Sequence, residues 1–143
     1  MKRLEELQPL IIEWAGKRNL LHKENAPKQR LKLIEECGEL AGAILKGNID
    51  DQKDAIGDIF VVLVILAEQL GVDDYDFEDD DYWNELDDLI SGICIHSKIE
   101  SKFSYLVNVT RELRLNLTEC ANLAYDQIKD RTGKTVGGTF IKD

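Results

Sequence analysis

The sequence predicts an all-α fold. Long stretches of the 143 residues contain no proline, since Pro9 and Pro27 are the only two in the chain, and proline disrupts helix interiors. Apolar side chains recur at helical spacing through most of the chain. Hydrophobic residues make up 43% of the sequence, and this length and composition suit one core. We therefore expect residues 1–143 to form a single helical domain.

Five helical segments follow in chain order. Pro27 is a favourable first residue for the second helix, and Gly47 ends it. Asp50 or Asp51 can cap the third helix, which Gly71 ends. The five segments cover about 3–17, 27–46, 50–71, 83–99 and 104–129.

Two segments fall outside this helical pattern. Residues 73–81 (DDYDFEDDD) form a dense acidic linker, and residues 133–143 form a glycine-bearing C-terminal tail. Neither has the apolar periodicity of a helix.

The third segment admits a second interpretation. Residues 59–65 (IFVVLVI) are rich in β-branched side chains and would also suit a buried strand. We favour a helix because the segment between its stop signals is longer than an ordinary strand. The short stretch 139–141 is the one partner strand that the chain offers.

The charge of the chain excludes some function classes. The net charge is −10, from 28 acidic and 18 basic residues, which argues against non-specific nucleic-acid binding. A phosphate-bearing small molecule stays compatible if a divalent cation mediates the contact. The longest apolar run, residues 59–67, is about half of a membrane span, and the charged N-terminus is unlike a signal peptide. We expect a cytoplasmic protein with no membrane partner.

Acidic side chains gather on the second and third helices. Glu35, Glu36 and Glu39 share one half of the helical wheel, which taken alone is typical of a solvated acidic face. The third helix is apolar on every side, yet Asp54 and Asp58 lie one turn apart near its start. A carboxylate that enters a core is costly unless it is paired or binds a metal.

The short connector between these two helices predicts an antiparallel hairpin. In such a hairpin Glu36 and Glu39 come opposite the region of Asp54 and Asp58. Carboxylates that converge in this way repel one another without a cation. Hard oxygen ligands on rigid helices suit Mg²⁺, with Mn²⁺ as the alternative ion.

Two motifs in these helices resemble a known family. Residues 35–40 (EECGEL) resemble the EExxE element of the MazG-like all-α nucleotide pyrophosphohydrolases, and residues 54–58 (DAIGD), followed by the apolar run, resemble its ExxD element. Trp14, residues 18–20, Gln29 and residues 128–134 are similar to further family features. The resemblance covers about two thirds of the chain, with the acidic linker as its least typical part.

The resemblance implies a four-helix core of the MazG type, completed by a second subunit in a homodimer or homotetramer. It also implies that Glu35 or Glu36, with Glu39 and Asp58, holds Mg²⁺ around a nucleoside triphosphate. A metal-activated water would attack the α-phosphorus, giving (d)NMP and pyrophosphate in a house-cleaning role. Glu35, where it is not a ligand, would orient or deprotonate this water.

One departure from the family pattern concerns the second element. The acid that should stand three residues before Asp58 is replaced by Ala55. Asp54 lies one residue earlier, still on the same helix face, and we treat it as the substitute metal ligand. If Asp54 does not take this role, one ligand is missing.

Basic residues complete the expected site. Lys32 lies on the same helix face as Glu36 and Glu39. Lys129, Arg131 and Lys134 form a basic end to an acidic chain, either as favourable charge at a helix C-terminus or as triphosphate ligands that reach across a subunit interface. For Trp14 we favour core packing over stacking on a base.

Two other functions stay open at this stage. A degenerate homologue would bind nucleotide or metal without turnover, as the change at Ala55 suggests. A purely helical interaction protein would use its apolar third helix for oligomerisation. Nothing in the sequence specifies which base or sugar is preferred.

Overall fold

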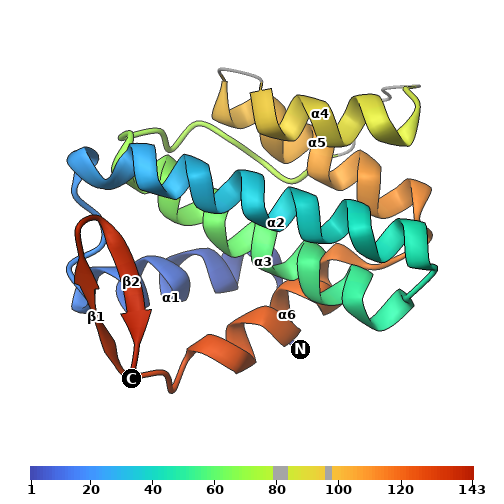
Figure 1. Cartoon of the computed structure of the whole chain (residues 1–143). Helices are drawn as coiled ribbons and strands as arrows, with labels where there is room; N and C mark the ends of the chain where they lie inside the picture. The colour runs from blue at the N-terminus through green and yellow to red at the C-terminus, as the bar shows by residue number, and fades with distance from the viewer. Residues whose placement is uncertain (79–83, 96–97) are drawn as a thin grey trace.

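The computed structural model of the chain describes residues 1–78, 84–95 and 98–143. Within these residues the chain is mainly helical (Figure 1), which confirms the predicted all-α class. A 3₁₀ turn, η1 (Lys23–Asn25), precedes the second helix, and a small β-hairpin ends the chain. The helices are α1 (Leu4–Lys17), α2 (Ala26–Lys46), α3 (Ile49–Gln69), α4 (Leu86–Ile95), α5 (Ile99–Glu112) and α6 (Leu117–Ile128). The strands are β1 (Gly133–Val136) and β2 (Thr139–Lys142).

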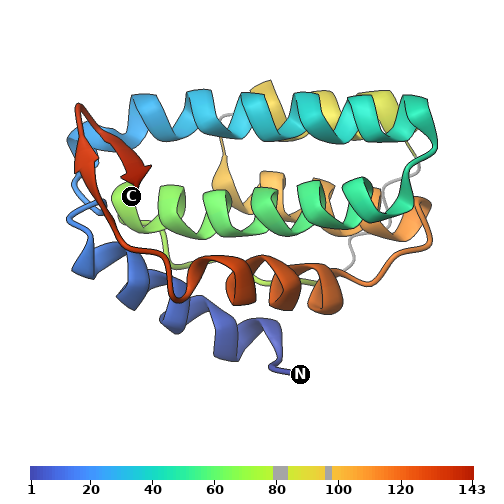
Figure 2. The same ribbon diagram turned by 60° about the horizontal axis from the view of Figure 1, so that its bottom comes forward.

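The helices α2 and α3 form the antiparallel hairpin that the short connector predicts (Figure 2). Gly47 ends α2 in the left-handed conformation, with φ of 67°, which costs glycine little. Asn48 then begins α3, because its side-chain Oδ1 accepts a hydrogen bond of 3.0 Å from the backbone N–H of Asp51. These two residues set how the acidic faces of the two helices meet.

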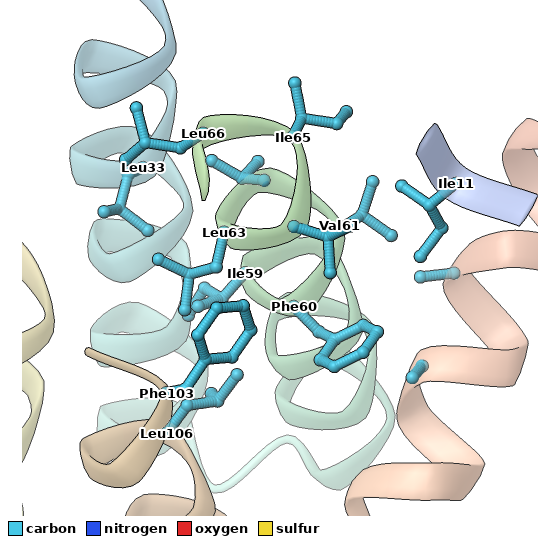
Figure 3. Close-up of a cluster of buried hydrophobic side chains, with 14 of the residues drawn as sticks. Ile11, Leu33, Ile59, Phe60, Val61, Leu63, Ile65, Leu66, Phe103 and Leu106 are labelled. Atoms are coloured by element: carbon cyan, nitrogen blue, oxygen red, sulfur yellow. The ribbon is translucent and has the colours of Figure 1, made fainter. Parts of the chain in front are cut away.

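The central helix α3 is surrounded by the rest of the protein. Every residue from Ile59 to Ala67 is buried, so the prediction of a buried helix rather than a strand is confirmed. Figure 3 shows side chains of α3 packing among those of neighbouring helices, with Leu33 of α2 and Phe103 of α5 nearby. This packing anchors the helix that carries Asp58.

A close approach between α3 and α6 depends on Gly57. A Cβ atom at this position would lie 2.2 Å from the backbone carbonyl oxygen of Cys120, a separation that no side chain tolerates without moving a helix. Glycine therefore lets α6 lie directly against α3, one residue before Asp58.

The C-terminal half of the chain differs from the prediction in two places. Residues 104–129, predicted as one helix, belong to α5 and α6, which are separated by a turn with Arg114 at φ of 58°. Asn116 caps α6 by accepting a hydrogen bond of 2.9 Å from the N–H of Glu119, and such a cap favours a new helix over continuation. Ile99 begins α5 rather than ending α4. The predicted start of the fourth helix at Trp83, and residues 79–81 of the predicted linker, lie outside the described residues.

The segment expected as a C-terminal tail contains the β-hairpin. Its two-residue turn consists of Gly137 and Gly138, both with positive φ, as a type I′ turn requires. The Thr135 hydroxyl donates a hydrogen bond of 2.7 Å to the backbone oxygen of Arg18, and the Phe140 ring packs 5.0 Å from the ring of Trp14. The hairpin is thus held against the C-terminal end of α1, near the beginning of α2 (Figure 2). Among the described residues, no helix is long and apolar enough to cross a membrane.

Candidate metal centre

Three carboxylates converge between α2 and α3. One side-chain oxygen each from Glu36, Glu39 and Asp58 lies within 4.8 Å of the others. Glu36 and Glu39 are three residues apart on α2 and therefore share a face. The antiparallel α2–α3 hairpin places Asp58 of α3 opposite them, as the sequence predicts.

Burial makes this cluster unfavourable when it is fully ionised. Glu36 is only 4% exposed, and this burial, together with the charge of Asp58, raises its pKa to about 7 in spite of the nearby Lys32 ammonium. The pKa of Asp58 is raised to about 6, mainly by burial and also by the charges of Asp54 and Glu39. The Lys32 Nζ pairs with Glu36 Oε1 at 3.1 Å, whereas the buried Glu36 Oε2 has no hydrogen-bond partner.

These features fit a divalent cation. Three convergent carboxylates, one with an unpartnered buried oxygen, supply the hard oxygen ligands that Mg²⁺ and Mn²⁺ prefer. A bound cation would offset the repulsion among the three charges. Both ions bind carboxylate oxygens of this kind.

The other two predicted acids lie beside the cluster and not within it. Glu35 is exposed, and its Oε1 pairs with Lys32 Nζ at 2.6 Å. Asp54 Oδ1 accepts a hydrogen bond of 2.7 Å from Gln127 Nε2 of α6, and Asp54 lines a neighbouring hollow together with Glu39. Ala55 is buried and lines the same hollow as Asp54 and Glu39, but its methyl group offers no ligand oxygen.

A cleft of about 480 Å³ opens over the cluster. Of the four predicted phosphate ligands, Lys32 and Arg131 line it. Lys129 is ion-paired with Asp126 at 3.1 Å, and Lys134 lies exposed on β1. Within the described part of the chain, neither of these two contributes to the cleft wall.

Sequence reasoning missed two cations of this cleft, Lys28 and Lys142. Lys28 lies one turn before Lys32 on α2, so its helical spacing was a signal that could have found it. Lys142 reaches the cleft only because the hairpin folds back, and no pattern in the sequence predicts that fold.

The wall of the cleft on the side of α1 is tied together by Arg18. Its guanidinium lies 4.4 Å from the ring centroid of Trp14 and donates hydrogen bonds to the backbone oxygens of Trp14 and Arg131. The Trp14 Nε1–H donates to the oxygen of Ile128 at 2.8 Å. Trp14 therefore packs in the core, as we favoured, while one edge of it lines the cleft.

The fold and the cluster together define a helical protein with a candidate carboxylate metal site in a cleft that is also lined by basic side chains. Comparison with protein families specifies this class further: residues 26–84 match the MazG nucleotide pyrophosphohydrolase domain. This segment includes α2, α3 and all three clustered carboxylates. The resemblance based on residues 35–40 and 54–58 is thereby confirmed.

A phage protein is similar to part of this chain. The two are 47% identical over 73 residues, which is 51% of this chain and 45% of the relative. The relative is described as an uncharacterized 18.2 kDa protein in the rep-hol intergenic region of Haemophilus phage HP1 (strain HP1c1). The match therefore spans less than half of its length, and its description names no activity. No solved structure matches the chain.

Proposed function

We propose that this protein is a Mg²⁺-dependent nucleoside triphosphate pyrophosphohydrolase that converts a (d)NTP and water to a (d)NMP and pyrophosphate. The observation that supports this most directly is the cluster of Glu36, Glu39 and Asp58. It lies within the segment that matches the MazG domain and faces a cleft bordered by cations.

Each charged group has a role in this proposal. Glu36, Glu39 and Asp58 hold the cation, and Asp54 joins them if it releases Gln127. The bound cation would neutralise phosphate charge and lower the pKa of a water ligand. Lys32 and Arg131 bind phosphate oxygens, and Glu35 orients or deprotonates the attacking water.

The proposal extends to a homodimer or homotetramer acting in the cytoplasm in nucleotide house-cleaning. Exposed apolar side chains on α2 support self-association, because Leu31, Ile34 and Leu45 all lie on the surface. Lys129 and Lys134 would then act, if at all, on the triphosphate bound by a neighbouring subunit.

A second candidate is a homologue that binds metal and nucleotide without turnover. The hydrogen bond from Gln127 to Asp54 favours this candidate. Asp54 is the acid expected to replace the one that is absent at Ala55, and this bond engages its carboxylate. In that case nucleotide affinity would depend on Mg²⁺, yet no pyrophosphate would be released. A helical interaction protein would show neither property.

The deciding experiment incubates the purified protein with ribo- and deoxyribonucleoside triphosphates and Mg²⁺ or Mn²⁺, measuring pyrophosphate and inorganic phosphate separately. We expect metal-dependent pyrophosphate that is lost in Glu39→Gln and in Asp58→Asn. Glu68→Gln is the matched control, because Glu68 is an exposed acid on the same helix as Asp58. The absence of pyrophosphate from every nucleotide with either ion would reject the proposal.

A further inference from the structure

The cleft over the acidic cluster has a second, apolar half that the proposed phosphate chemistry does not use. Neither a cation nor a phosphate gains from hydrocarbon walls. At about 480 Å³ the whole cleft falls within the roughly 300–1,000 Å³ of small-molecule sites. The apolar residues that line it are Trp14, Leu20, Val61, Val62, Ile65, Ile128 and Phe140.

The C-terminal hairpin builds one wall of this apolar half. Gly138, Thr139 and Phe140 line the cleft from the turn and β2. The hairpin is fixed in place by the contact of Phe140 with Trp14 and by the hydrogen bond of Thr135 to Arg18. It lies outside residues 26–84, so the family match assigns it no role.

One polar side chain is buried within these apolar surroundings. Gln29 is 6% exposed, and its Nε2 donates a hydrogen bond of 3.3 Å to the backbone oxygen of Val62. This bond fixes the amide orientation, because a carbonyl oxygen at the Nε2 position would face another carbonyl. Gln29 Oε1 is left as an acceptor without a partner among the described residues, in a residue that lines the cleft.

We propose that the apolar half is a nucleobase subsite, with Phe140 as its wall and Gln29 Oε1 as the acceptor for an exocyclic amine. A flat aromatic ring that carries an amine satisfies both the apolar lining and the unpartnered oxygen. The subsite therefore selects bases that carry an exocyclic amine, such as cytosine, over uracil, which has none. This inference rests on the proposed function, since the triphosphate of the same nucleotide occupies the acidic half.

The test measures binding and not turnover. The ligands are the α,β-methylene analogues of CTP and UTP, which differ at the amine, and inorganic tripolyphosphate, which has no base. Each is titrated calorimetrically in the presence of Mg²⁺. Phe140→Ala is the main variant, and Ile141→Ala is its matched control, because Ile141 is an exposed neighbour on the same strand.

We expect Phe140→Ala to weaken both nucleotide analogues roughly 10- to 100-fold, leaving tripolyphosphate affinity within about twofold. Ile141→Ala should change none of the three affinities. If Phe140→Ala weakened tripolyphosphate as much as the nucleotides, or weakened neither, the subsite would be wrong. If Phe140→Ala lowers the unfolding temperature, Phe140→Leu replaces it, because leucine keeps an apolar side chain in the hairpin and removes the aromatic ring. This variant must then show the same selective loss of affinity for the two nucleotide analogues.

Gln29→Met tests the hydrogen bond. The wild-type protein should bind the CTP analogue about fivefold more tightly than the UTP analogue, and Gln29→Met should abolish this preference. Equal wild-type affinity for the two analogues would overturn the assignment of Gln29. Pyrophosphate release from CTP is measured in parallel. Base-selective binding without pyrophosphate release would reject the proposed function and support the subsite. Pyrophosphate release, together with a Phe140→Ala variant that does not selectively weaken nucleotide binding, would support the function and reject the subsite.

Discussion

Replacing Glu36 with glutamine should stabilise the metal-free protein at alkaline pH. The pKa of this carboxyl rises from 4.5 to about 7 on folding. The folded state therefore holds the proton more tightly than the unfolded state does. Its contribution to stability is complete below pH 4.5 and is lost as the pH rises through 7. The difference of about 2.5 pH units corresponds to about 3 kcal/mol, at about 1.36 kcal/mol per unit.

Glutamine keeps the size of the side chain and removes the buried charge. In Glu36→Gln the cost of about 3 kcal/mol disappears. This cost is already net of the ion pair with Lys32, since the Lys32 ammonium lowers the pKa that burial and Asp58 raise to about 7. We expect a gain of about 1–3 kcal/mol in unfolding free energy at pH 8, and little change at pH 5.

Urea denaturation in the presence of a chelator measures this free energy at the two pH values. Added Mg²⁺ should then stabilise the wild-type protein at pH 8 and leave Glu36→Gln unaffected, because the cation binds only the folded wild-type cluster. A variant less stable than the wild-type protein at pH 8 without metal would refute the reasoning, since the charge would then not be a cost.

Two further perturbations test the packing beside the cluster and the cationic wall of the cleft. Gly57→Ala should destabilise the protein by about 1–3 kcal/mol in urea denaturation, because its Cβ would meet the Cys120 carbonyl; Gly38→Ala, with open space around its Cβ, should instead stabilise it by about 0.5–1 kcal/mol. Arg131→Gln should raise KM for the triphosphate about tenfold or more, because Arg131 lines the cleft. Lys129→Gln is the control and should leave KM unchanged. Equal effects of the two substitutions in steady-state kinetics would contradict a role of Arg131 in binding the triphosphate.

The parts of this molecule that sequence could predict are those that local spacing controls. The helical wheel places Glu36 and Glu39 on one face of α2, and the short connector at Gly47 predicts an antiparallel hairpin. Together these two features predict that Asp58 lies opposite the two glutamates. The break between α5 and α6 was missed because the apolar spacing continues through it, while the cap at Asn116 decides the outcome.

The apolar half of the cleft lay beyond sequence reasoning for a different reason. It is formed where the hairpin meets α1, α3 and the end of α6, and the contact of Phe140 with Trp14 joins residues that are far apart in the chain. Periodicity describes one element at a time, so it cannot report which loop folds back over which helix. The acidic half was predictable because α2 and α3 are neighbours in sequence.

Under the proposed function, turnover depends on the position of Asp54. Its bond to Gln127 links α3 to α6, and α6 lies against α3 through Gly57. A hydrogen bond between an amide and a carboxylate contributes about 1.5–3 kcal/mol. The attraction between a divalent cation and the Asp54 carboxylate can exceed this at short range. The same Asp54 charge also helps raise the pKa of Asp58, so the two acids are already electrostatically coupled. The observed bond to Gln127 is therefore compatible with a side chain that turns to the cation when the cluster is filled, so Asp54 stays the proposed substitute for the acid that is absent at Ala55.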